Sequence, residues 1–358
     1  MAKEVNYTLP KNTSWSARWP QWIGFVTAIW SLLYGLLGLY WMLGGNGFPF
    51  GPGDPNGAQE SVLEGLRVET GAPVIAVLGL IGVLLALIMS FRWGGKVVRI
   101  PLLTIAILLA AALLIIIPDR RVLMAVAYAP IFLIGAPFHW PPVSFSKAIP
   151  WPVINQAILM VGGALWAATA VTYNRSIRGA CTHCGRLSTQ SEEISKQKAL
   201  YWGKWAVAFA AMIPIVYAAT RWIWALGIPL GISEQMLREG QASGMWLAGA
   251  SLASVSIVGS ILTLGLVQRW GEIFPRWMIG LAGKRVPPRL AIIPATIVAL
   301  VVTSAGLEYV RIVATRASFI ESWTTMGPEL LWPFWGVALG AATLAYAYRR
   351  RERCKYCS

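Results

Sequence analysis

The sequence predicts an all-α protein, a polytopic transmembrane helical bundle with about eight spans, and three observations lead to this prediction. Of its 358 residues, 56% are hydrophobic and only 13% are charged, whereas soluble domains contain roughly 25% charged residues. The charged residues lie in short segments between long apolar runs, such as 71–91 and 99–118. Each run has about the 20 residues that a helix needs to cross a bilayer while its backbone groups hydrogen bond within the segment.

The apolar runs define the individual spans. We predict spans at about 20–43, 71–91, 99–118, 152–173, 202–226, 244–267, 288–309 and 330–348. A ninth candidate, 122–137, is interrupted by Pro130 and is short for a hydrocarbon core about 30 Å thick. We interpret it as a re-entrant or interfacial segment on the outer side. The polar residues 1–18 form an N-terminal tail without an apparent cleavable signal peptide.

The basic residues predict the orientation of the spans. The formal net charge is +15, and most of the 30 lysines and arginines fall in alternate loops next to the ends of the spans. Because basic residues concentrate in cytoplasmic loops, this bias places both termini in the cytoplasm and accounts for the charge without nucleic-acid binding. A nine-span alternative with an external N-terminus would place the basic loop 92–99 outside, so we rank it second.

Three matched patterns indicate that the chain is an internal duplication. They lie at the ends of spans 1 and 5, spans 2 and 6, and spans 4 and 8, at offsets of 183, 177 and 173 residues. In order, the pairs are Tyr34 and Trp41 with Tyr217 and Trp224, Arg92-Trp93-Gly94 with Arg269-Trp270-Gly271, and Tyr173-x7-Cys181 with Tyr346-x7-Cys354. Aromatic residues favour membrane interfaces in any protein, but this does not explain cysteine pairs at matched positions.

The duplication defines the predicted domains. Residues 1–18 are a cytoplasmic tail, 19–186 the first four-span repeat and 187–358 the second. Because each repeat has an even number of spans, both have the same orientation, and a pseudo-twofold axis along the membrane normal should relate them.

The only four cysteines form two CxxC pairs: Cys181 with Cys184, and Cys354 with Cys357. Under the predicted topology both pairs lie in the reducing cytoplasm, where structural disulfides are rare. Thiolates at this spacing suit tetrahedral zinc, and the pseudo-twofold axis would join them into one structural site. Thiol–disulfide redox chemistry, reduced cysteines without metal and an iron–sulfur cluster remain alternatives. His183 is a less symmetric ligand, because Tyr356 occupies the corresponding position.

Charged residues inside spans are candidates for a second site, because their burial in hydrocarbon is costly. We select Arg221 and Glu308, which together with Asp119, Arg121 and Arg311 would form an outer polar site. Anchoring at the interface is the alternative interpretation. The middle of each span lacks Asp, Glu, Lys and His, which argues against an ion-coupled carrier and an intramembrane metal enzyme. The outer His139 has no catalytic context.

The loop 269–289, RWGEIFPRWMIGLAGKRVPPR, mixes basic and aromatic residues. This pattern predicts a helix lying in the anionic inner interface. The same stretch, together with YWMLGG at the end of span 1, resembles an uncharacterised bacterial membrane-protein family of Gram-positive type. The resemblance implies a bacterial plasma-membrane location and carries no activity over to this chain.

Three functions remain open from the sequence. The first is binding or permeation of a small hydrophobic or anionic ligand, or a lipid, between the halves. The second is a non-catalytic scaffold, sensor or resistance factor that binds a protein partner through the basic cytoplasmic loops. The third is a membrane thiol–disulfide oxidoreductase that uses the CxxC pairs.

Overall fold

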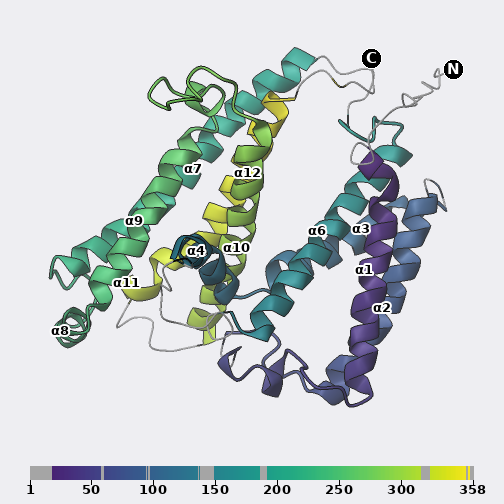
Figure 1. Cartoon of the computed structure of the whole chain (residues 1–358), viewed down its shortest axis with the longest axis horizontal. Helices are drawn as coiled ribbons and strands as arrows, with labels where there is room; N and C mark the ends of the chain where they lie inside the picture. The colour runs from purple at the N-terminus through teal and green to yellow at the C-terminus, as the bar shows by residue number, and fades with distance from the viewer. Residues whose placement is uncertain are drawn as a thin grey trace. The chain divides into compact units, whose positions relative to one another are not determined.

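The computed structural model describes residues 18–57, 60–93, 95, 97–135, 137, 149–185, 192–315, 323–351 and 354. Within these ranges the chain is helical, and Figure 1 shows the arrangement of the helices. The described residues form no strand, and Ile273 and Arg285 form an isolated antiparallel bridge.

Eight helical segments of the described chain are long and apolar enough to cross a membrane, as the sequence predicts. The first four are α1 (Trp19–Met42), α2 (Val68–Phe91), α3 (Arg99–Ala111) continued by a π turn (Ala112–Ile116), and α6 (Trp151–Ile177). The second four are α7 (Glu192–Ala225), α9 (Met245–Leu264), α10 (Pro288–Thr315), and α12 (Trp332–Arg349) preceded by the short helix η8 (Pro328–Leu331). The protein is therefore an all-helical membrane bundle.

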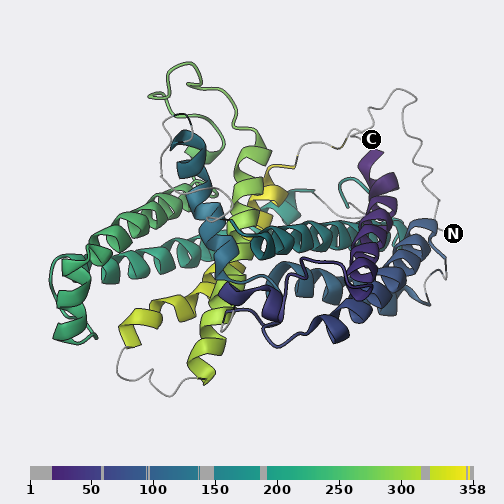
Figure 2. The ribbon, with the colours of Figure 1, turned by 60° about the horizontal axis from the view of Figure 1, so that its bottom comes forward.

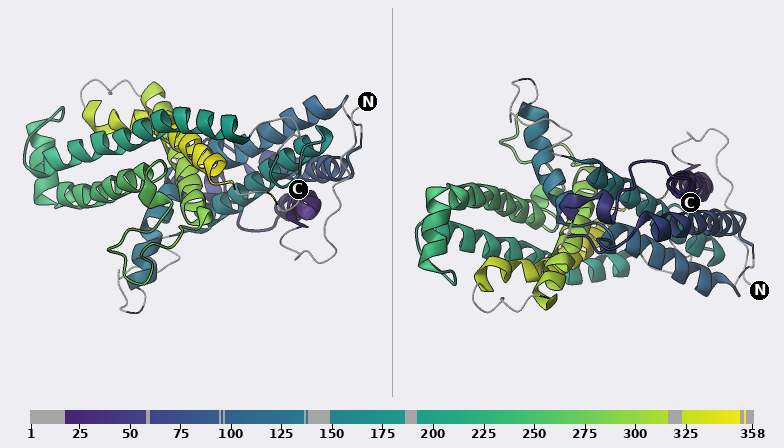
Figure 3. Two further views of the ribbon diagram at one scale, coloured as in Figure 1. Left: turned by 90° about the horizontal axis from the view of Figure 1, so that it is seen from above. Right: turned by 90° about the horizontal axis from the view of Figure 1, so that it is seen from below.

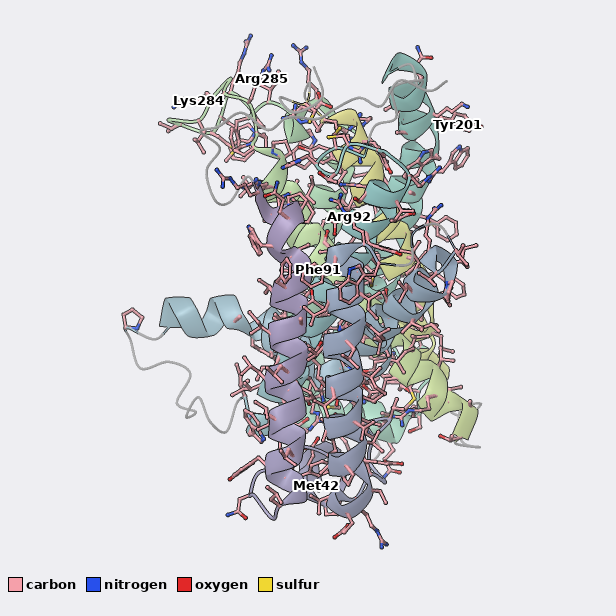
Figure 4. The ribbon with its side chains drawn as sticks, turned by 90° about the vertical axis from the view of Figure 1, so that its right-hand side faces the viewer. Met42, Phe91, Arg92, Tyr201, Lys284 and Arg285 are labelled. Atoms are coloured by element: carbon pink, nitrogen blue, oxygen red, sulfur yellow. The ribbon has the colours of Figure 1, made fainter. Side chains whose placement is uncertain are left out.

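Helix α4 (Arg120–Gly135) covers the segment predicted to be re-entrant or interfacial. With 16 residues it is shorter than the eight spanning segments and is not among them. Figure 2 shows α4 crossing the direction of α6, and Figure 4 shows it crossing the direction of α1 and α2.

The other described helices are short. They are η2 (Gly51–Gly53), η3 (Pro55–Gly57), α8 (Glu234–Ala242), η6 (Arg269–Gly271) and α11 (Trp323–Met326). Figure 3 shows α8 joining the neighbouring helices α7 and α9.

The chain divides into two compact units. The first comprises Met1–Gln190 together with Arg351–Ser358, and the second comprises Ser191–Arg350. In the first unit, α1 packs against α2 and α6, and α3 packs against α6. In the second unit, α7 packs against α9 and α12, and α10 packs against α12. The helices therefore pair in the same order within each unit.

Close approach of α1 and α2 depends on glycine. A Cβ atom added at Gly79 would lie 2.4 Å from the Cα atom of Gly35, so only glycine fits without a shift of backbone. Small residues at such crossings bring backbones together and replace the hydrophobic driving force that lipid-embedded helices lack. The buried hydroxyls of Thr27 and Thr169, 2.8 Å apart, join α1 to α6 in the same unit.

Helices at matched positions of the two units bury matched residues. Every residue that is buried in the segment Pro328–Arg349 lies 173 positions after a buried residue of α6. The pairs include Gln156 with Glu329, and Tyr173 with Tyr346. At an offset of 183 residues, most of the buried positions of α1 correspond to buried positions of α7. These pairs are Gly24 with Val207, Thr27 with Ala210, Ala28 with Ala211, Ser31 with Pro214, Gly35 with Ala218, and Trp41 with Trp224.

The prediction of a helix across the loop 269–289 was wrong for the central part of the loop. Only the 3₁₀ turn η6 and the start of α10 are helical there. Gly280 and Gly283 adopt φ angles of +82° and +74°, a conformation that ends a helix and that glycine adopts without steric cost. The loop instead folds back on itself through the bridge between Ile273 and Arg285.

Candidate metal centre

The end of α6 positions the first CxxC pair. The backbone N–H of Ala180 donates to the Arg175 carbonyl at 2.9 Å, and that of Gly179 to the Ser176 carbonyl at 3.2 Å. Gly179 has φ of +66°. These two bonds and a left-handed glycine form a Schellman motif, which ends the helix and satisfies its last carbonyls. Cys181 therefore follows directly after a fixed helix end.

Hydrogen bonds within the turn and from the Arg175 side chain hold the turn that contains Cys181 and Cys184. The Gly185 N–H donates to the Cys181 carbonyl at 2.7 Å. The Arg175 Nη1 atom donates to the carbonyls of Thr182 and His183, both at 3.0 Å. Since the two carbonyls accept from one guanidinium, the turn is fixed in a shape that directs both cysteines to one side.

Three cysteine sulfurs converge at this turn. The Sγ atoms of Cys181, Cys184 and Cys354 all lie within 4.8 Å of one another, and those of Cys181 and Cys354 are 3.9 Å apart. A disulfide requires about 2.05 Å between sulfurs. Four thiolates around zinc, with Zn–S bonds of about 2.3 Å in tetrahedral geometry, place neighbouring sulfurs about 3.8 Å apart. The spacing therefore matches metal coordination and not a bonded pair.

The burial of the three thiols also suits a bound metal. Cys181 is buried, and Cys184 and Cys354 are half-buried. Thiolates are the metal-binding form of cysteine. All three cysteines lie in the first unit. The fourth predicted ligand, Cys357, lies outside the described residues.

The polar residues predicted to form an outer site fall into both units. In the first, Arg121 donates to Asp54 through Nη1 and Nη2 at 2.8 and 2.6 Å, and to Asp119 through Nε and Nη2 at 3.0 and 2.6 Å. Burial lowers the pKa of Arg121, but the hydrogen bonds to Asp54 and Asp119 outweigh it, so the pKa is raised. Arg121 is thus a permanent cation between two buried carboxylates.

Gln156 completes this group. Its Nε2 atom donates to Asp119 Oδ2 at 2.6 Å, and its Oε1 atom accepts from the Asp119 backbone N–H at 3.0 Å. Nearby, Arg120 forms an ion pair with Glu60 at 2.6 Å. The network ties the loop after α1 to the start of α4 and to α6.

In the second unit, Arg221 forms an ion pair with Glu329 and donates to the Thr325 carbonyl at 3.3 Å. Its guanidinium carbon lies 4.7 Å from the ring centre of Tyr217 and 4.5 Å from that of Trp224. Both distances are within the range of cation–π attraction. Glu308, on α10, is buried, and Arg311 is half-buried.

Comparisons with known proteins give no assignment. No family model, curated protein or solved structure matches the chain. Function is therefore inferred from the residues of this chain alone.

Asp54, Gln156 and Glu329 are functional residues that the charges within the spans did not predict. Asp54 lies in the loop after α1, outside the spans. Gln156 carries no charge, and Glu329 falls just before the predicted start of the last span. For Gln156 and Glu329 a signal exists, because they are 173 residues apart, the offset that relates the cysteine pairs.

Proposed function

We propose that this protein is a bacterial plasma-membrane protein of two duplicated four-span repeats, in which a cytoplasmic four-cysteine zinc centre holds the C-terminal tail on the first repeat. The observation that carries the proposal is the convergence of the sulfurs of Cys181, Cys184 and Cys354 within 4.8 Å. Cys357 would be the fourth ligand. With four sulfurs the zinc has no open position for substrate or water, so its role is structural.

The position of Cys354 in the chain explains what the centre would do. Cys354 follows α12, the last span of the second unit, yet it belongs to the first unit together with Cys181 and Cys184. A metal ion bound to Cys181, Cys184 and Cys354 would connect the loop after the fourth span with the tail after the eighth. The centre would then restrain the chain ends of both repeats.

The burial pattern supports the duplication. Lipid-facing and protein-facing positions can be distributed in many ways along an apolar helix, so two unrelated spans have no reason to bury the same set. The segment Pro328–Arg349 buries only positions that α6 also buries at the offset of 173. Helix pairing in the same order within each unit supports it further.

Basic residues near the cysteine turn support a cytoplasmic location of the cysteines. Arg99, at the start of α3, donates from Nη2 to Asn174 Oδ1 near the end of α6 at 2.7 Å. The basic loop 92–99 and Cys181 therefore lie at the same end of the first unit. Since basic loops are predominantly cytoplasmic, the cysteines would be cytoplasmic too.

Metal analysis of purified protein tests the proposal. We expect stoichiometric zinc in the wild type, and loss of it in Cys181→Ser, Cys354→Ser and Cys357→Ser. His183→Ala is the matched control, because it changes the same turn without removing a sulfur, and it should retain zinc. Wild-type protein without any metal, purified without chelators, would refute the centre.

The same variants separate zinc from redox chemistry. A thiol–disulfide oxidoreductase would form a mixed disulfide that Cys184→Ser or Cys357→Ser traps, because the resolving thiol is missing. A zinc-bound set of thiolates would yield no such adduct under mild oxidation. We therefore expect bound zinc and no trapped adduct.

Two repeats in parallel orientation also suit binding or permeation of a small hydrophobic or anionic ligand between them, as in transporters built from parallel repeats. Native mass spectrometry of protein released from its own membrane tests this activity. A retained small molecule or lipid of defined mass would support it. Capture of a partner protein at the basic loops, with no retained ligand, would favour the scaffold function.

A further inference from the structure

The loop between α9 and α10 is closed at its base. The Phe274 N–H donates to the Lys284 carbonyl at 3.0 Å, and the Gly283 N–H donates to the Phe274 carbonyl at 3.0 Å. The Val286 N–H donates to the Glu272 carbonyl at 2.9 Å. These bonds and the bridge between Ile273 and Arg285 join the two arms of the loop. Residues 275–282 therefore form a defined tip.

The last turn of α12 fastens the base of this loop. The Tyr346 hydroxyl donates to the Gly271 carbonyl at 2.8 Å, and Arg349 and Arg350 donate to the carbonyls of Leu266 and Val286 at 2.5 and 2.7 Å. Leu266 and Val286 are buried. Because three side chains of one helix end hold both arms, the tip is presented in a fixed direction.

The tip is apolar and exposed, with basic flanks. The exposed fractions are 78% for Trp277, 99% for Ile279 and 41% for Leu281. Arg276, Lys284 and Arg285 beside them are also exposed. Figure 4 shows Lys284 and Arg285 with Tyr201 at one end of the second unit, their side chains pointing away from the helices.

We propose that the tip 275–282 docks on the surface of an anionic bilayer, with Trp277 and Ile279 among the upper acyl chains and with Lys284 and Arg285 on lipid phosphates. A fully exposed isoleucine beside a tryptophan is costly in water and suits the headgroup boundary, where aromatic rings concentrate. Basic side chains next to the apolar residues add attraction to anionic lipid. The net charge of the loop is strongly positive, since residues 265–289 contain five basic residues and one acidic residue, Glu272.

A bilayer fits this surface better than a protein partner does. The loop connects two spanning helices, so the ends of its arms at Leu264 and Pro288 lie at the membrane boundary. The lipid surface is thus within reach of the tip by connectivity alone. This proposal does not depend on the metal centre.

Photocrosslinking of the full-length protein tests the docking. p-Benzoyl-phenylalanine replaces Ile279 in nanodiscs of phosphatidylcholine alone, or of equal parts phosphatidylcholine and phosphatidylglycerol. We expect lipid adducts several-fold above those at Gln235, an exposed position of the polar helix α8. In the mixed discs the adducts should be enriched in phosphatidylglycerol.

Charge-neutralising pairs give the matched control. Lys284→Gln with Arg285→Gln should abolish the enrichment, whereas Arg67→Gln with Arg238→Gln, which removes two exposed charges elsewhere, should retain it. Thermal unfolding, followed by tryptophan fluorescence, checks that both double variants are folded. Lipid adducts at Ile279 no more abundant than at Gln235 would overturn the proposal. Adducts with a second polypeptide in place of lipid would overturn it in favour of a protein interface.

Discussion

The Cys181 sulfur lies 3.9 Å from the Cys354 sulfur, although 173 residues separate the two cysteines in the chain. Cys181 follows α6, the fourth spanning segment, and Cys354 follows α12, the eighth. The two cysteines occupy matched positions of the proposed duplication. With the two sulfurs this close, one metal ion bound to both would restrain the segment after α6 and the segment after α12 together.

If the proposed zinc centre holds the C-terminal tail, removal of the metal should release it. The tail contains several trypsin sites, among them Arg351, and proteolysis samples segments that open locally. We expect a membrane-permeant chelator to accelerate tryptic removal of the tail several-fold in the wild type. Cys181→Ser should lose the tail rapidly with or without chelator. Equal rates in the treated and untreated wild type would contradict a metal-held tail, and mass spectrometry of the digest measures the rates.

Arg121 should be far more important for stability than the adjacent Arg120. Arg121 is largely buried between Asp54 and Asp119, whose side chains are 5% and 2% exposed. Substitution Arg121→Met would leave both carboxylates buried without their cation, at a cost of about 3–5 kcal/mol. Arg120→Met removes a more exposed pair with Glu60 and should cost about 1 kcal/mol or less.

Denaturant unfolding of the purified variants measures the difference between these two arginines. A loss of stability that is as small for Arg121→Met as for Arg120→Met would show that the two buried carboxylates do not depend on Arg121. Because the pKa of Arg121 is raised, its positive charge should persist throughout the neutral and mildly alkaline range.

Much of the fold was predictable because each span is a continuous apolar run. Hydropathy placed eight helices, and the structure places most of their ends within a few residues of the prediction. Helix α7 begins at Glu192, ten residues before the predicted span, and α10 extends to Thr315, six residues beyond it. The convergence of the first CxxC pair with Cys354 was predictable from the matched patterns Tyr173-x7-Cys181 and Tyr346-x7-Cys354. The fourth sulfur, Cys357, stays a prediction.

The parts that sequence reasoning missed depend on contacts between distant residues. Glu329 forms an ion pair with Arg221 because η8 packs against α7, and hydropathy does not encode this packing. Asp54 lies in a loop of glycine and proline that has no periodicity. The loop 269–289 was predicted as a helix from its alternating basic and aromatic residues, while Gly280 and Gly283 in left-handed conformations decided its fold.

The glycine crossing of α1 and α2 should tolerate no side chain. In Gly79→Ala the new Cβ would lie 2.4 Å from the Cα atom of Gly35, and forced overpacking costs typically about 1–3 kcal/mol. Gly259, on the spanning helix α9, is the matched control because a Cβ there meets nothing within 4 Å. Gly259→Ala should be neutral or gain up to about 1 kcal/mol from helix propensity. Thermal unfolding in one detergent compares the two, and equal melting temperatures would refute the close approach.

Two tyrosines, one in each unit, offer a paired test of the loop anchor. Tyr346 and Tyr173 occupy matched positions, and both are buried. The Tyr346 hydroxyl donates to the Gly271 carbonyl, whereas the Tyr173 hydroxyl has no hydrogen-bond partner among the described residues. Tyr346→Phe should therefore cost about 0.5–1.5 kcal/mol, while Tyr173→Phe should cost little.

Hydrogen exchange across residues 269–286 gives this pair of variants a local readout. We expect Tyr346→Phe to speed exchange at the Phe274 and Val286 amides, which close the base of the loop, because the lost bond lowers the free energy of local opening. Tyr173→Phe should leave the loop unchanged, since Tyr173 is in the other unit. Unchanged exchange in Tyr346→Phe would mean that Arg349 and Arg350 alone hold the loop, and the double variant Arg349→Met with Arg350→Met should then release it.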